Sequence, residues 1–187
     1  MGPFMPKARA AAQRAVELDD NLAEAHTALA LIVQNYDYDW QTSENEFRRA
    51  IELNPNYATA HHWNAEHLTW LGRFDEALRE SERARQLDPL SLIIRADNGA
   101  TLYYARQYDQ AIAQFSAVRE MDPNFPRAGL IRFAYEQKGL FVNALDEIEK
   151  WRRAYGDQPW SCGTARTTLP KNRPAPAGHC SKHHFQN

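Results

Sequence analysis

Three similar phrases recur along the sequence: RRAIELNP at residues 48–55, ERARQLDP at 82–89 and SAVREMDP at 116–123. Their final residues, Pro55, Pro89 and Pro123, are spaced 34 positions apart. A fixed period of this length is the signature of a repeat protein. Because the proline ring removes a backbone donor and clashes with the preceding turn, each proline marks a point where a helix has already ended. The phrases therefore predict units of one length, each closing with a helix.

A second set of phrases recurs within the same units. It comprises Gly72-Arg-Phe-Asp-Glu-Ala-Leu, Arg106-Gln-Tyr-Asp-Gln-Ala-Ile and, with a slip of one residue, Gly139-Leu-Phe-Val-Asn-Ala-Leu. Apolar residues return every three or four positions on both sides of these phrases, which is the pattern of amphipathic helices. One such stripe runs through Tyr108, Ala111, Ile112, Phe115, Val118 and Met121. Each unit is therefore predicted to be a pair of helices joined by a short turn.

This pattern resembles the tetratricopeptide repeat (TPR), a helix-turn-helix unit with small residues where its helices cross. The small residues are Ala30, Ala65 and Gly99 in the first helices, and Ala77, Ala111, Ala144, Ala50 and Ala84 in the second. The resemblance implies an all-α fold, a right-handed superhelix or TPR solenoid. Phrases such as EFRRAIELNPNYATAHHW also resemble the TPR segments of bacterial signalling and regulatory proteins.

The alignment divides the chain into unequal parts. We expect an N-terminal half repeat at 1–21, full units at 22–56, 57–90 and 91–125, a degenerate fourth unit at 126–155, and a disordered tail at 156–187. The first full unit has an extra residue near Tyr36, which we expect to lengthen its turn, and the fourth is one residue short before Tyr135. The tail changes composition abruptly near Ser161, so a shift of reading frame there is one hypothesis.

Composition and charge exclude several functions. The chain has 187 residues, of which 43% are hydrophobic and 25% charged, as in soluble globular proteins. Up to Asp157 there are 18 basic and 24 acidic residues, a net charge of -6 that disfavours nucleic acid as a partner. No run of 18 apolar residues and no signal peptide is present. We therefore expect a cytoplasmic protein with no membrane partner.

The stretch HHWNAEH at residues 61–67 suggests a metal site, because it holds three histidines and a glutamate. On a helix, however, His62 and His67 lie roughly 140° apart, and a catalytic zinc needs three converging protein ligands. The alternative is that His61 and His67 are packing residues. The tail has a second histidine and cysteine group around Cys180, but its spacing is irregular. We predict no metal, no cofactor, no catalytic residue and no enzyme activity.

The resemblance also implies an inner, concave surface on which a partner segment binds. The residues predicted to line this groove are Gln34, Asn35, His62, Glu66, Thr69, Trp70, Tyr103 and Tyr104. Large aromatic side chains often dominate the energy of an interface, so the tryptophan and the tyrosines are candidate anchors. The alternative is that they only pack between units.

Asn64 departs from the repeat pattern, since such repeats usually have a large apolar residue at its position.

These observations predict a non-enzymatic scaffold that binds a protein or peptide in its groove. The alternative is a regulatory TPR fragment of a larger bacterial signalling enzyme, such as a kinase or cyclase, or of a transcriptional regulator. The half repeat lacks its first helix, so we expect apolar surface to be exposed there, around Ala8, Ala12, Ala15 and Val16. Self-association through exposed array ends is a further expectation.

Overall fold

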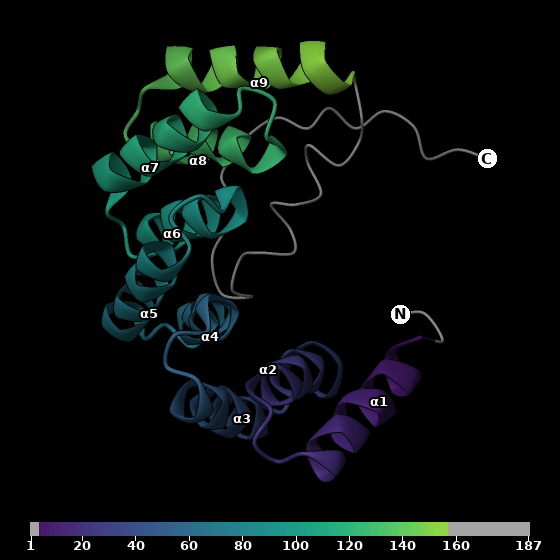
Figure 1. Cartoon of the computed structure of the whole chain (residues 1–187). Helices are drawn as coiled ribbons and strands as arrows, with labels where there is room; N and C mark the ends of the chain where they lie inside the picture. Colours follow the sequence, from purple (N-terminus) through teal and green to yellow (C-terminus); the bar gives the residue numbers. More distant parts are fainter. Residues whose placement is uncertain (1–3, 157–187) are drawn as a thin grey trace, which may run out of the picture.

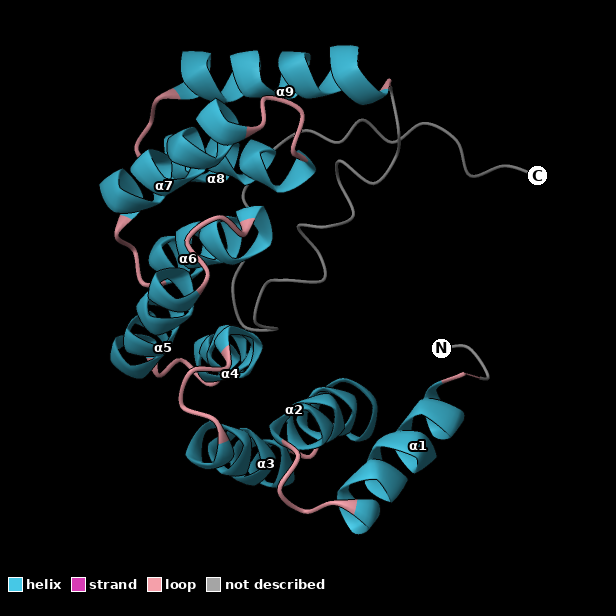
Figure 2. Cartoon of the chain, viewed as in Figure 1, coloured by secondary structure: helices cyan, strands magenta, loops and turns pink. Residues whose placement is uncertain are grey.

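The computed structural model describes residues 4–156, and every regular element in that range is a helix (Figures 1 and 2). In chain order these are α1 Met5–Leu18, α2 Ala23–Ile32, the π-helix η1 Val33–Asp37, α3 Trp40–Leu53, α4 Ala58–Trp70, α5 Phe74–Leu87, α6 Leu92–Tyr104, α7 Tyr108–Met121, the 3-10 helix η2 Pro126–Leu130, α8 Ile131–Gln137 and α9 Phe141–Tyr155. The all-α solenoid predicted from the repeat is confirmed.

The helices follow one another around an arc, with α2, α4 and α6 toward its inner side and α3, α5 and α7 toward its outer side (Figure 1). Direct contacts join α2 to α4 and α4 to α6, so successive inner helices form one continuous wall. Each outer helix packs on the inner helix before it and the one after it. This arrangement places residues from equivalent positions of neighbouring units side by side on the inner face.

Small residues allow these helices to pack closely. Ala50, Ala84 and Ala111 are fully buried, since each has 0% of its surface exposed. Gly99 of α6 faces the ring of Phe115 of α7, and a Cβ atom added there would lie 3.0 Å from the ring. Larger side chains at these crossings would force the helices apart. The predicted role of the small residues thus agrees with their burial.

The turns between helices repeat as well. Where a second helix ends, the Asp19, Asn54 and Asp122 side chains accept a hydrogen bond from the backbone two residues later, at 3.0, 3.1 and 2.9 Å. Inside the units, Gly72 has a φ of 77°, and Arg106 at the matching place has a φ of 64°. Glycine is the residue that tolerates this left-handed conformation most easily. The same turn therefore forms in both units although only one has the favoured residue.

The two irregular units differ from the regular ones in helix type. In the first full unit, the extra residue was expected to lengthen the turn, but it is accommodated mainly by the π-helix η1. Tyr38 then reverses the chain with a φ of 57°, and Asp39 caps α3 by accepting a hydrogen bond from the Thr42 amide at 3.0 Å. In the fourth unit, the shortened first helix begins with the 3-10 helix η2.

The N-terminal half repeat does not expose the surface that we expected. Ala12 is buried, and Ala8, Ala15 and Val16 are half-buried, because this face of α1 packs against α2. Exposed apolar side chains do lie at both ends of the array, but at other positions: Phe4 and Leu18 near α1, and Phe141, Val142 and Leu145 on α9. The tail predicted at 156–187 lies, apart from Gly156, outside the described residues. No helix within residues 4–156 combines the length and the apolar character that a membrane crossing requires.

Candidate functional site

The three histidines of HHWNAEH point to three different partners. Their nearest N···O contacts are 2.6 Å from His61 to Glu80, 2.7 Å from His62 to Asp97, and 2.7 Å from His67 to Gln34. Because the partners belong to different helices, the rings do not meet at one point. Within residues 4–156, no group of three or more histidine, cysteine, aspartate or glutamate side chains has an arrangement suited to a metal ion. The histidine and cysteine group of the tail lies outside this range.

Three of the predicted groove residues lie close together on α4 and α6. Glu66 and Trp70 are one helical turn apart on α4, and the Trp70 indole donates a hydrogen bond to the Glu66 carboxylate at 3.3 Å. The Trp70 ring lies 6.5 Å from the ring of Tyr104 on α6, with the two planes tilted by 39°. All three side chains are half-buried. Trp70 and Tyr104 occupy equivalent positions in successive units, which explains why the repeat brings them together.

Tyr103 has a different environment from its neighbour. Its ring lies 5.4 Å from Tyr104, 5.8 Å from Tyr108 and 6.3 Å from Phe133, and it packs against the core around Phe115. The alternative interpretation, in which the aromatic residues pack between units, therefore applies to Tyr103. Tyr104 and Trp70 remain the candidate anchors.

Gln34 does not lie on the groove surface, and this prediction is wrong. Gln34 is only 2% exposed, and the oxygen of its side-chain amide contacts the buried ring of His67. The π-helix η1 changes the directions in which successive side chains point. Gln34 therefore faces the protein core and not the concave surface. The next residue, Asn35, is exposed, but its amide donates to the carbonyl of Leu31 at 2.8 Å.

Two further predicted groove residues are occupied by contacts within the protein. His62 is 7% exposed and binds Asp97, while the Thr69 hydroxyl donates to the Ala65 carbonyl of its own helix at 2.7 Å. Sequence reasoning did not find the ion pair between Asp97 and Arg127 of η2, which continues this polar chain along the array. The only sign of this ion pair in the sequence is a charged residue, Asp97, at an inner position, and the sequence does not indicate which residue it contacts.

The environment of Glu66 is unusual for a carboxylate. Burial raises the pKa of Glu66, and the nearby negative charge of Asp97 raises it further. The hydrogen bond from Trp70 and the more distant charges of His62 and Arg127 act in the opposite direction. Among the described residues, Glu66 has no ion pair, whereas Asp97 has both His62 and Arg127. The site therefore has an uncompensated acidic group beside two aromatic rings.

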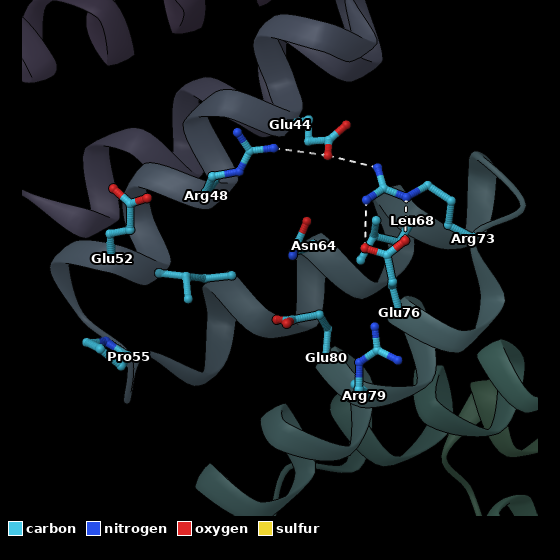
Figure 3. A pocket seen from close by; sticks show the side chains of 11 residues that line it. Glu44, Arg48, Glu52, Pro55, Asn64, Leu68, Arg73, Glu76, Arg79 and Glu80 are labelled. Carbon is cyan, nitrogen blue, oxygen red and sulfur yellow. Dashed lines mark hydrogen bonds and ion pairs between the residues drawn. The ribbon is translucent and has the colours of Figure 1, made fainter.

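A cavity of about 370 Å³ lies on another side of the array, between α3, α4 and α5 (Figure 3). Apolar side chains, Ile51 and Leu68, line it together with charged residues from α3 and α5. Asn64 also lines the cavity, at the position where such repeats usually have a large apolar residue, and none of the hydrogen bonds of the described region involves its amide. The cavity thus lies where the missing apolar side chain would be.

A curved array of two-helix units with a continuous inner wall is a TPR-type solenoid. The solved structures agree with this class. MamA has a TM-score of 0.65 and 21% identity over 78% of this chain and 85% of its own. PilF of Pseudomonas aeruginosa has a TM-score of 0.71 and 21% identity over 82% and 70%.

YrrB, described as a TPR protein with an unusual peptide-binding site, has a TM-score of 0.67 and 22% identity over 87% of this chain and 84% of its own. No protein-family model matches the sequence, and no curated protein matches it. The structural likenesses show that the chain has the TPR fold, an all-α right-handed superhelix.

Proposed function

We propose that this protein is a non-enzymatic scaffold of the cytoplasm that holds a segment of a partner protein, or a peptide, against its inner wall. The observation that carries the proposal is the cluster of Glu66, Trp70 and Tyr104, which joins α4 to α6. Stacked units expose such a surface because each contacts only its neighbours. The peptide-binding site described for the similar structure YrrB supports a ligand of this class.

The physical properties of the cluster also support this proposal. Aromatic rings supply a large contact area with few rotatable bonds, so ordering them on binding costs little entropy. The rings of Trp70 and Tyr104 are already close, at 6.5 Å, and the indole is held by Glu66. The net negative charge of the body favours a protein partner over nucleic acid.

The test uses the full chain and a library of random peptides displayed on phage. Peptides selected by the wild type are synthesised, and their affinities for the variants Trp70→Ala and Tyr104→Ala are measured by fluorescence polarisation. We expect each variant to bind roughly tenfold more weakly or worse, as at interface anchors. Phe141→Ala is the matched control, because this aromatic residue is 63% exposed and lies on α9.

The proposal fails if the wild type selects no peptide, or if the two groove variants bind the selected peptides as tightly as the control does. Circular dichroism of each variant separates loss of the site from loss of the fold. Tyr103→Ala serves as the comparison for a packing residue. Its effect is expected on thermal stability more than on affinity, since its ring contacts three other aromatic side chains.

A further inference from the structure

Glu66 is a half-buried carboxylate whose partners do not balance its charge. Its one hydrogen bond comes from the Trp70 indole at 3.3 Å, which is long for a bond to an ionised acceptor. No lysine, arginine or histidine of the described region lies within ion-pair distance of it. Charges removed from water are normally paired, because the lost hydration is otherwise uncompensated. An unpaired acid in this position therefore calls for an explanation.

The surrounding charges favour a cation as a partner of Glu66. Asp97, the acid whose charge acts on Glu66, already contacts His62 at 2.7 Å and pairs with Arg127. Both partners are thus engaged by Asp97, and the negative charge of Asp97 still acts on Glu66. Burial and Asp97 together raise the pKa of Glu66, which means that its ionised form lacks stabilisation. A positive charge placed beside Glu66 would supply it.

The walls around Glu66 also suit a cation. Trp70 and Tyr104 present two aromatic rings with centroids 6.5 Å apart, and a cation within about 6 Å of such a ring is attracted to its face. In α6 the position equivalent to Glu66 is Ala100, so the neighbouring unit contributes only a methyl group there. A slender, positively charged side chain fits this environment better than an acidic or bulky apolar one.

We infer that Glu66, Trp70 and Tyr104 form a subsite for a lysine or arginine side chain of the segment bound in the groove. This inference rests on the proposed function and specifies the chemistry of its partner. The carboxylate supplies the counter-charge, and the rings cover the aliphatic stem of the basic side chain. The net charge of -6 up to Asp157 attracts a basic segment toward the inner wall before contact.

The experiment repeats the phage selection with wild type, Glu66→Gln and Glu52→Gln. The control removes the same unit charge from α3, at the exposed Glu52 that lines the cavity of Figure 3, so general attraction of basic peptides is matched. We expect lysine or arginine to be enriched at one position among peptides selected by the wild type and by Glu52→Gln. Selection by Glu66→Gln should keep the apolar positions of these peptides and lose that enrichment.

Affinities give the second readout. Replacing the enriched basic residue with norleucine should weaken binding to the wild type roughly tenfold, and should change binding to Glu66→Gln much less. Selected peptides without basic enrichment, or an enrichment that survives in Glu66→Gln, overturn this inference and leave the proposed function standing. Failure of the wild type to select any peptide overturns both.

Discussion

Replacing Asn64 with leucine should stabilise the protein, although the change removes a polar group from a charged surface. Asn64 is half-buried on α4 and lines the cavity between α3, α4 and α5 beside Ile51 and Leu68 (Figure 3). A leucine there would place apolar atoms against apolar atoms. The amide that it replaces takes part in none of the hydrogen bonds of the described region, so no such bond is lost.

The size of the effect follows from burial. Full burial of a leucine side chain is worth about 1.5–3 kcal/mol, and a half-buried site gives roughly half of that. Leucine also exceeds asparagine in helix propensity by a few tenths of a kcal/mol. The sum is about 1–2 kcal/mol. For a chain of this length, each kcal/mol raises the Tm by about 2–4 °C, so we expect an increase of roughly 2–8 °C.

The measurement is thermal and urea denaturation followed by far-ultraviolet circular dichroism. Asn64→Ala is the control, because it removes the amide without filling the cavity and should give at most a third of the gain. A Tm that falls in Asn64→Leu would refute the reasoning, since it would show that the amide makes contacts that stabilise the fold. An equal gain in both variants would mean that the cavity contributes nothing.

Three other changes test separate parts of the structure. Gly99→Ala should destabilise the protein by about 1 kcal/mol in urea denaturation: overpacking against the Phe115 ring, 3.0 Å away, costs about 1–3 kcal/mol and exceeds the gain in helix propensity. Unchanged stability would mean that this ring moves aside. Burial lowers the pKa of His61, but its hydrogen bonds to Glu80 and to a backbone carbonyl raise it more, to a net value above the ordinary one. Protonated His61 therefore stabilises the folded state. This stabilisation is complete below about pH 6.5, the pKa in the unfolded chain, and disappears as the pH rises through the higher pKa of the folded state. Tm profiles of wild type and His61→Gln should converge on the alkaline side, and parallel profiles would contradict the assignment. On α9, Leu145 is 64% exposed beside the exposed apolar residues Phe141 and Val142, which suits pairing with a second copy. Sedimentation equilibrium should show a wild-type dimer and a Leu145→Glu monomer, and a monomeric wild type would rule out this pairing.

The repeat could be predicted from the sequence because its determinants are local and recur. Prolines at a fixed spacing mark the helix ends, and alanines such as Ala50 and Ala84 mark the crossings, where only a small side chain fits. The neighbouring position of Trp70 and Tyr104 follows from the same periodicity, since equivalent residues of adjacent units lie side by side. These features require no knowledge of the particular contacts.

Other features of the site depend on contacts that periodicity does not encode. Gln34 was assigned to the groove on the assumption that its helix is regular, and the π-helix at this point directs it toward His67 instead. The pairing of Asp97 with Arg127 joins residues of different units and leaves Glu66 without a counter-ion. Charge type alone does not indicate which acid is paired, so the cation subsite became visible only in three dimensions.

The irregular units show how the array keeps its geometry when the repeat length changes. The inner helices α4 and α6 have 13 residues each. In the first full unit, α2 has 10 residues and η1 adds 5, while in the fourth unit η2 has 5 and α8 has 7. A π-helix bonds residues five apart, so it absorbs an extra residue. A 3-10 helix rises about 2.0 Å per residue, against about 1.5 Å in an α-helix, so it spans the same length with fewer residues.

Insertion and deletion are therefore compensated inside the first helices, and the second helices α3 and α9 keep almost the same length as the others, with 14 and 15 residues. This compensation determines where in the array a functional site can lie. The wall formed by α4 and α6 lies between the two irregular units, and both of its helices are regular α-helices of the same length. A site that needs equivalent residues of successive units to meet, as Trp70 and Tyr104 do, is expected in this regular pair before any other place in the array.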